Sequence, residues 1–413
     1  MTNSNTSSSS NAFSMPEGAP SAARATLKLL LRLKHGTLTI KLPDGSVQRF
    51  GNGHAPQASL HLLNWNVCSA ALKSGDIGFA ESYIAGDWTT PHLTELLQVF
   101  IVNRKEVEDV IYGTWLGRFA YRVKHVLNRN TKANSQKNIH AHYDLGNAFY
   151  ELWLDGTMNY SSAIFETPET SMKDAQHAKV RRALRMAQVK PDDRLLEIGC
   201  GWGALAEKAT QEFDANVVGV TLSTEQLQWA NKRMQREGVA EKADLRLQDY
   251  RDIGKTTQDA PFDAICSIEM VEAVGREYWP EYFQTVHRLL KPGGYACIQS
   301  IVIADELFER YLSSTDFIQQ YVFPGGCLPC PREFRAQAAA AGFEVMDEFS
   351  FGQDYAHTLQ LWREQFAAQE AHVLQLGFDK RFIRIWEFYL SYCEAAFLEA
   401  NTDVVQYTLR KPR

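Results

Sequence analysis

Short apolar runs alternate with helical stretches through the second part of the chain. Five runs have the length and composition of buried strands: 194–198, 216–220, 244–247, 262–267 and 295–302. Strands that alternate with helices in this way form a parallel sheet covered by helices on both faces. The pattern therefore predicts an α/β domain that extends from residue 142 to the C-terminus.

The first part of the chain has a different pattern. Residues 23–34 have the spacing of a basic amphipathic helix, and residues 37–42 and 47–50 alternate as the two strands of a hairpin. From about residue 58 the periodicity is mostly helical. These elements predict a small, mostly helical N-terminal domain over residues 23–127.

Two segments have the composition of flexible chain. Residues 1–22 are rich in Ser, Asn, Ala and Pro, and they lack the basic start and apolar core of a secretory signal. We expect them to form a disordered tail. Residues 128–141 are expected to be the linker between the two domains.

A basic segment lies between Ile111 and Tyr143, where no acidic residue occurs. Aromatic side chains interleave with its cations, which is typical of segments that contact an anionic membrane surface. Each cation near such a surface contributes about 1 kcal/mol. The alternative is a solvated linker whose charges have no specific partner.

Composition excludes some classes of function. The net charge of −6 gives no indication of nucleic acid as a partner, and no run approaches the roughly 18 apolar residues of a membrane span. Seven scattered cysteines without a signal peptide favour a reducing, cytosolic compartment. Cys327 and Cys330 have redox or zinc spacing, but no second Cys or His pair lies nearby. We favour a Pro-rich loop there and expect no metal site.

A glycine-rich turn is the first candidate for a binding site. Gly199 to Gly203 follows the strand 194–198 at once, and a helix begins at Ala204. Glycines at such a turn let a ligand approach the backbone closely, and the first N–H groups of the helix are free to bind it. The spacing G-x-G-x-G differs from the G-x-G-x-x-G of nicotinamide sites, so the run alone indicates only a nucleoside-type cofactor.

Two neighbouring strand ends narrow the choice of cofactor. Thr221, Ser223 and Gln226 follow the strand 216–220, within reach of a ribose or a methionine group. Beyond the strand 244–247, Asp249 can accept a hydrogen bond from an adenine amino group, and Tyr250 can stack on the ring. Because ligands bind beyond the carboxyl ends of parallel strands, these groups together favour S-adenosylmethionine.

At this point the chain resembles the cyclopropane-fatty-acyl-phospholipid synthases. The resemblance covers nearly the whole chain after about residue 25. The motifs that carry it are His142-Tyr-Asp-Leu-Gly-Asn147, Met158-Asn-Tyr-Ser161, Leu196-Glu-Ile-Gly-Cys-Gly-Trp-Gly203, Gly219-Val-Thr-Leu-Ser223, Gln248-Asp-Tyr-Arg-Asp252, Tyr321-Val-Phe-Pro324 and, in the N-terminal domain, Gly75-Asp-Ile-Gly-Phe-Ala-Glu-Ser-Tyr83.

The resemblance implies a Rossmann-like, seven-stranded class I methyltransferase domain behind an N-terminal domain for membrane contact and homodimer formation. It implies a cytoplasmic enzyme, peripheral on the inner face of the membrane. The methyl carbon of S-adenosylmethionine would be transferred to a cis double bond of an unsaturated phospholipid. The residues then expected to bind the cofactor are Tyr160, Ser161, Glu197, Gly199, Gly201, Trp202, Thr221, Leu222, Ser223, Gln226, Gln248, Asp249, Tyr250 and Arg251.

Methyl transfer to an alkene leaves a carbocation, so the site must exclude water and remove one proton. In the family a bound bicarbonate is the base. The resemblance places its holders at Glu272, Tyr355, Gln299 and the backbone N–H groups of Ser162 and Ile301. An aromatic ring face, with Tyr321 among the candidates, would stabilise the cation.

Three positions depart from the family pattern. Gln299 and Ala273 stand where His is usual, and Ser162 stands where Cys is usual. A neutral Gln donates a hydrogen bond to an anion but supplies no positive charge. Two products therefore stay open: a cyclopropane ring, which we favour, and a methyl- or methylene-branched chain that forms after a hydride shift.

Other interpretations remain at this stage. Cys393 matches a recurring cysteine of the family, but the chemistry needs no thiolate, and we favour a packing role for it. A methyltransferase for a small amine or phosphobase is a rival function, and it predicts neither a lipid-facing first domain nor an anion site at Glu272 and Tyr355. A lipid-binding protein without catalysis is the second rival.

Overall fold

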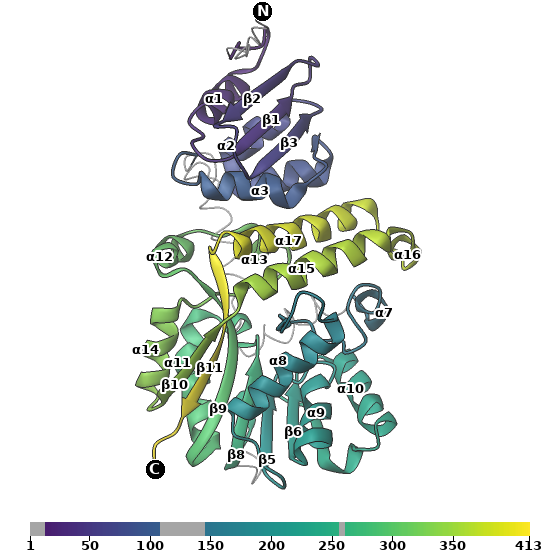
Figure 1. Cartoon of the computed structure of the whole chain (residues 1–413), viewed down its shortest axis with the longest axis vertical. Helices are drawn as coiled ribbons and strands as arrows, with labels where there is room; N and C mark the ends of the chain where they lie inside the picture. Colours follow the sequence, from purple (N-terminus) through teal and green to yellow (C-terminus); the bar gives the residue numbers. More distant parts are fainter. Residues whose placement is uncertain (1–12, 108–144, 256–260) are drawn as a thin grey trace, which may run out of the picture. The chain divides into compact units, whose positions relative to one another are not determined.

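A computed structural model describes residues 13–107, 145–255 and 261–413 of the chain (Figure 1). The chain divides into two compact units, residues 1–120 and 121–413. The basic segment between Ile111 and Tyr143, the predicted linker and most of the predicted tail lie outside the described residues, as do the first three residues of the motif that begins at His142.

The N-terminal unit contains a four-stranded sheet and three described helices. The strands have the order β2-β1-β3-β4. The elements are α1 (Ser21–Leu30), β1 (Thr37–Lys41), β2 (Val47–Gly51), β3 (Gln57–Leu62), α2 (Asn66–Ala85), β4 (Trp88–Thr89) and α3 (Leu93–Val102). Antiparallel pairing of β1 with β2 confirms the predicted hairpin. Residues 58–62, which the periodicity placed in a helix, belong to β3 because their burial alternates as it does in a strand.

Helix α1 is amphipathic, as the sequence predicted. Its apolar positions Ala23, Leu27 and Leu30 are buried in the N-terminal unit, while Arg24 and Lys28 are exposed. The helix therefore presents cations to solvent and its apolar stripe to the core. In the three described ranges, no helix combines the length and the apolar character that a membrane crossing requires.

The C-terminal unit is built on a seven-stranded sheet with the order β10-β11-β9-β8-β5-β6-β7. The strands are β5 (Arg194–Ile198), β6 (Asn216–Thr221), β7 (Ala243–Leu247), β8 (Phe262–Ile268), β9 (Leu290–Ile303), β10 (Glu344–Ser350) and β11 (Thr402–Arg410). The five predicted strands and their parallel pairing are confirmed. At the other edge, β11 runs antiparallel to both of its neighbours, β9 and β10.

Helices cover both faces of this sheet (Figure 1). In the described residues they are α7 (Asn147–Tyr150), α8 (Met172–Met186), α9 (Ala204–Phe213), α10 (Thr224–Arg236), α11 (Trp279–Leu289), α12 (Asp305–Ser313), α13 (Phe317–Tyr321), α14 (Pro331–Ala340), α15 (Gly352–Ala368), α16 (Glu370–Gln375) and α17 (Lys380–Leu398). Successive residues of β5 enter different cores: Leu195 packs with α8, α9 and α10, and Leu196 packs with α11 and α14. Burial on both faces explains why β5 is largely apolar, with Glu197 as a buried exception.

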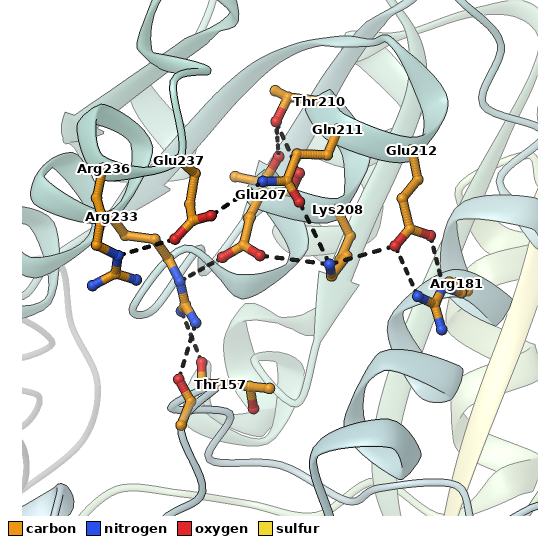
Figure 2. Close-up of polar contacts among 12 residues, drawn as sticks. Thr157, Arg181, Glu207, Lys208, Thr210, Gln211, Glu212, Arg233, Arg236 and Glu237 are labelled. Atoms are coloured by element: carbon orange, nitrogen blue, oxygen red, sulfur yellow. Dashed lines mark hydrogen bonds and ion pairs between the residues drawn. The ribbon is translucent and has the colours of Figure 1, made fainter.

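Buried Arg233 of α10 joins three segments that border the strand ends (Figure 2). Its guanidinium pairs with Glu207 of α9 at 2.7 Å. It also donates to the carbonyl oxygens of Thr157 at 2.8 Å, Trp202 at 3.0 Å and Gly156 at 3.3 Å. One side chain therefore fixes the glycine-rich turn against the loop that leads to Tyr160.

Replacement of Arg233 by Met should destabilise the protein by about 3 kcal/mol or more, because Glu207 and three carbonyl oxygens lose a buried partner. Arg181→Met is the matched control. It removes a half-exposed ion pair with Glu212, which lies on α9 as Glu207 does, and should change stability by at most about 1 kcal/mol. Urea-induced unfolding of both variants measures the difference. Equal losses would contradict the role given to Arg233.

Candidate active site

The glycine-rich turn lies between β5 and α9, as predicted. Gly199 and Gly201 have φ values of 86° and 50°, a region that other residues rarely adopt. A Cβ at Gly199 would lie 3.1 Å from Met270, whereas a Cβ at Gly201 would meet nothing within 4 Å. The turn is thus tight on one side and borders open space on the other.

The ends of β6 and β7 bring polar side chains to the same cavity. Thr221 donates to Gln226 at 3.0 Å, and Ser223 caps α10 by accepting from the N–H of Gln226. Asp249 accepts from the side chain of Arg251 with both carboxylate oxygens, at 2.9 and 2.6 Å. All the residues predicted to bind the cofactor line this cavity except Ser223, which serves as the helix cap.

Lys179 of α8 supports the loop at the mouth of this cavity. It is fully buried and donates to the hydroxyl of Ser161 at 2.6 Å and to Asn159 at 3.2 Å. Burial lowers the pKa of Lys179 to about 8, against the carboxylates of Glu269, Asp155 and Glu197. Burial also raises the pKa of Glu197 to about 8, against the charge of Lys179.

The residues of this cavity fit S-adenosylmethionine. The backbone at Gly201 borders space for a ligand, and Glu197 Oε2 is buried with no hydrogen-bond partner in the described protein. A buried acceptor without a partner suits a ligand that donates hydrogen bonds. The cavity also lies where ligands of parallel sheets bind, beyond the carboxyl ends of β5, β6 and β7.

A second, more apolar cavity adjoins the first. It is lined by side chains of α13, α15 and α17 and by the chain that follows α13, including Ile318, Phe323, Leu359 and Phe397. Three residues line both cavities: Tyr160, Glu269 and Ala273. A ligand held in the first cavity can therefore reach a second ligand held in the apolar cavity at the position of these three residues.

Glu269 is the centre of the polar contacts at this junction, and the sequence analysis did not identify it. Its Oε1 accepts from the N–H of Ser162 at 2.9 Å and from the side-chain amide of Gln299 at 2.7 Å. Its Oε2 accepts from the hydroxyl of Tyr355 at 2.7 Å. Burial raises the pKa of Glu269, while these three donors and Lys179 lower it.

A chain of amides fixes the orientation of Gln299. The oxygen of Gln299 accepts from the amide of Gln406 at 3.0 Å, and the oxygen of Gln406 accepts from Arg182 at 2.8 Å. Arginine can only donate, so the amide oxygen of Gln406 must face Arg182 and its NH₂ group must face Gln299. The oxygen of Gln299 then faces Gln406, and its NH₂ group faces Glu269. Gln299 is therefore a fixed donor to the Glu269 carboxylate.

Glu272 lies next to this network, in the short 3₁₀ turn Val271–Ala273. One of its carboxyl oxygens accepts from the N–H of Ile301, and the other has no hydrogen-bond partner in the described protein. Burial, followed by the charge of Glu269, raises the pKa of Glu272 to about 8. Lys179 lowers the pKa of Glu269, whereas the charge of Glu269 raises the pKa of Glu272, so Glu269 is the carboxyl that ionises first.

The structure brings together all five groups that the resemblance assigned to bicarbonate, but they do not fit a free anion. Ser162, Gln299 and Tyr355 donate to Glu269, and the N–H of Ile301 donates to Glu272. A further anion would lie beside two buried carboxyl groups with its donors already engaged. In this structure the five groups predicted to hold bicarbonate are engaged with the protein's own carboxyl groups, and bicarbonate binding stays a prediction.

The remaining candidate residues have clear places. Cys393 lines the apolar cavity, and burial raises the pKa of its thiol, which favours the neutral form. Tyr321 does not line that cavity and stacks on Phe317 instead. Cys327 and Cys330 are buried free thiols. In the described ranges, no group of three or more His, Cys, Asp or Glu side chains is arranged to hold a metal ion.

Several residues of the site were missed at the sequence level. Arg233, Lys179 and Gln406 lie on elements whose apolar positions suggested only packing, and no local pattern marks them. Glu269 had a signal: it directly follows the strand 262–268 and precedes Glu272 by three residues, at the same sheet edge as the glycine turn.

Comparison with known proteins identifies the family. The family model of mycolic acid cyclopropane synthetase matches residues 130–407. The chain belongs to this family. It is an S-adenosylmethionine-dependent methyltransferase, as the resemblance predicted.

Relatives within the family match over most of their length. Tuberculostearic acid methyltransferase UfaA1 of Mycobacterium tuberculosis is 35% identical over 404 residues, which cover 95% of this chain and 92% of the relative. The cyclopropane-fatty-acyl-phospholipid synthase of Escherichia coli K12 is 33% identical over 355 residues, with coverages of 86% and 88%. The solved structure of mycolic acid cyclopropane synthase CmaA1 with SAH and CTAB matches with a TM-score of 0.62 at 32% identity, covering 67% of this chain and 98% of that one.

The raised pKa of Glu272 gives a pH dependence of stability. The folded protein keeps this proton up to about pH 8, whereas the unfolded chain loses it near 4.5. Over that range the folded state binds more protons, so the contribution of Glu272 to stability decreases as the pH rises. Glu272→Gln cannot ionise. Relative to the wild type, it should therefore gain about 1 kcal/mol or more in stability between pH 5.5 and pH 8.

Unfolding free energies of the wild type and of Glu272→Gln at both pH values test this dependence. Glu241→Gln is the matched control, because Glu241 is exposed and the same change of side chain should have no effect there. A stability difference between Glu272→Gln and the wild type that stays constant with pH would show that Glu272 ionises normally.

Proposed function

We propose that the protein transfers the methyl carbon of S-adenosylmethionine to a cis double bond of an unsaturated phospholipid acyl chain and forms a cyclopropane ring. The observation that carries this proposal is the junction of two cavities at Tyr160, Glu269 and Ala273. One cavity fits the cofactor, and the other has the apolar lining that an acyl chain requires.

The apolar cavity favours a lipid over a small amine. Its walls come from Ile318, Phe323, Leu359 and Phe397, which bind methylene groups through the hydrophobic effect. The carboxyl groups of Glu269, Glu272 and Asp316 also line the cavity and could pair with an amine, so it is the predominantly apolar character of its walls that favours an acyl chain. The junction also holds a buried carboxylate, which removal of a proton from a cation requires.

The chain's residues contribute to the reaction in distinct ways. Bound S-adenosylmethionine supplies an electrophilic methyl group. Tyr160 and Tyr389 are held together by a hydrogen bond of 2.7 Å between their hydroxyl groups, and both line the apolar cavity. Their rings offer π faces to a cation on the acyl chain. The surrounding apolar side chains exclude water, which would otherwise trap that cation as an alcohol.

A branched product is the second candidate. Ring closure and branching share the same first cation, and they differ in whether a hydride shift precedes loss of the proton. The names of two relatives support both products: one is a tuberculostearic acid methyltransferase, and another is a cyclopropane-fatty-acyl-phospholipid synthase. A carboxylate already in place at the junction favours early proton loss and hence the ring.

A phospholipid substrate requires the protein to act at a membrane surface. We place the protein in the cytoplasm, peripheral on the inner face of the membrane and as a homodimer. Exposed Arg24, Lys28 and Arg32 in and after α1 support attraction to anionic lipid, and the seven free cysteines suit a reducing compartment.

Vesicles of dioleoylphosphatidylglycerol and dioleoylphosphatidylethanolamine test the proposed reaction. The purified protein with S-adenosylmethionine should release S-adenosylhomocysteine and add one CH₂ unit to the oleoyl chains, as measured by mass spectrometry. Vesicles of the matching saturated lipids should give neither result, because they have no alkene. Proton NMR of the product separates a cyclopropane ring from a branched alkene. Release of S-adenosylhomocysteine with small amines but not with the unsaturated vesicles would overturn the proposal.

A further inference from the structure

We propose that Glu269 is the general base of this enzyme, so that the reaction proceeds without bound bicarbonate. The inference deepens the proposed function and rests on it for the identity of the reacting carbon. It depends on where the carboxylate lies, on what holds it there and on the space that surrounds it.

The first observation is the position of Glu269. Its carboxylate lines both the cofactor cavity and the apolar cavity. A proton that leaves the transferred methyl group leaves at this junction, because the methyl carbon passes from one cavity to the other. Among the residues that line both cavities, Glu269 is the one whose side chain can accept a proton as a carboxylate.

The second observation is the set of donors. A carboxylate with three hydrogen-bond donors, one of them a backbone N–H, is held in one position and one rotamer. These donors come from separate elements: the loop before α8, the strand β9 and the helix α15. The protein therefore builds an anion site and fills it with its own side chain.

The third observation is that the acceptor at this site is covalently attached to the chain and needs no cationic side chain to recruit it. A dissolved anion must be recruited from water, and a cationic side chain helps to bind it. A carboxylate attached to the backbone needs no recruitment, since its effective concentration at the site is fixed by the fold. Neutral Gln299, oriented by Gln406 and Arg182, is then sufficient as a donor.

The fourth observation is the backbone of Glu269. Its φ is 49°, in the left-handed region that non-glycine residues rarely adopt. Such strain persists only where the surrounding structure enforces it, and it is concentrated at functional sites. The strained backbone directs the side chain back toward Ser162 and Tyr355, where its donors lie.

The charged and titratable groups around Glu269 support an ionised base. Lys179 of α8 contributes an opposite charge, and Tyr355 of α15 donates to the carboxylate. Glu272 of the adjacent 3₁₀ turn is the competing acid, and burial together with the charge of Glu269 raises its pKa to about 8, so it retains its proton. The three donors and the charge of Lys179 therefore favour the negative charge of this pair on Glu269.

The chemical step balances without another reactant. The alkene π electrons form a bond to the methyl carbon as the carbon–sulfur bond breaks, and that bond's electrons stay on sulfur. The second alkene carbon becomes cationic. A C–H bond of the new methyl group then breaks: its electron pair closes the ring, and its proton passes to Glu269. The protonated carboxyl returns this proton to solvent after the product leaves.

Variants of the full-length protein test the base, in carbonate-free buffer with and without added sodium bicarbonate. Glu269→Gly removes the carboxylate and suits the positive φ, so it adds no backbone strain. We expect a loss of about a hundredfold or more in the rate of ring formation on the dioleoyl vesicles, as for removal of a general base. Bicarbonate or formate should restore at least about a tenth of the wild-type rate to this variant, by binding where the carboxylate was.

Two further variants show whether the loss of activity is specific to the Glu269 carboxylate. Glu269→Gln keeps the shape of the side chain, so it should lose the same activity and bicarbonate should not rescue it. The exposed control Glu241→Gln should behave as the wild type, whose rate should not respond to bicarbonate. A wild-type rate that requires bicarbonate, or a Glu269→Gln variant that keeps most of its activity, would overturn the inference.

A binding measurement separates this inference from the proposed function. NMR of ¹³C-labelled bicarbonate should detect binding to folded Glu269→Gly and none to the wild type, with retained S-adenosylmethionine binding as the test of folding. This result would support the filled anion site even if the vesicles were not methylated, in which case the proposed function alone would fail. Bicarbonate binding by the wild type would contradict the inference directly.

Discussion

The hydrogen bonds that hold the buried Glu269 carboxylate connect most of the C-terminal unit. Ser162 belongs to the loop at the mouth of the cofactor cavity, Gln299 to the central strand β9, and Tyr355 to the helix α15 that covers the apolar cavity. A buried carboxylate without these donors would be strongly destabilising. The three donors must therefore all be in place at once. Because the elements that carry them border the two cavities, the Glu269 side chain helps to fix the shape of both.

The buried polar groups around this carboxylate form a layered arrangement. Lys179 lies on the cofactor side, where it also positions the hydroxyl of Ser161. Gln406 of β11 and Arg182 of α8 lie behind Gln299 and fix the orientation of its amide. Such networks rigidify a site only when every member is satisfied. The exception is Glu272, whose second carboxyl oxygen has no partner within the described protein and lies in a residue that lines the apolar cavity.

The sequence predicted those parts of the molecule that depend on local pattern. The predicted strands include β5, β6 and β8, where burial on both faces produces mainly apolar runs. The glycine turn was found because its backbone needs residues without side chains. The strand β10 was missed because its alternate residues are exposed at the edge of the sheet. The strand β11 was missed because its polar residues Gln406 and Thr408 are buried by partners elsewhere in the chain.

The donors of Glu269 were found only through resemblance, because no local rule relates them. Ser162 lies 107 residues before Glu269, and Tyr355 lies 86 residues after it. The resemblance supplied the donors and assigned them to a dissolved anion. It did not point to the acceptor, and the place of Glu269 became evident only when the side chains were positioned in space.

The left-handed backbone at residue 269 has an evolutionary consequence. A glycine would adopt this conformation without strain and would leave the same donors exposed to a small anion from solution. A glutamate at that position occupies them permanently. An enzyme that borrows its base from the solvent and one that encodes its base could therefore differ at a few positions, residue 269 and the donor at residue 299 among them, on the same fold.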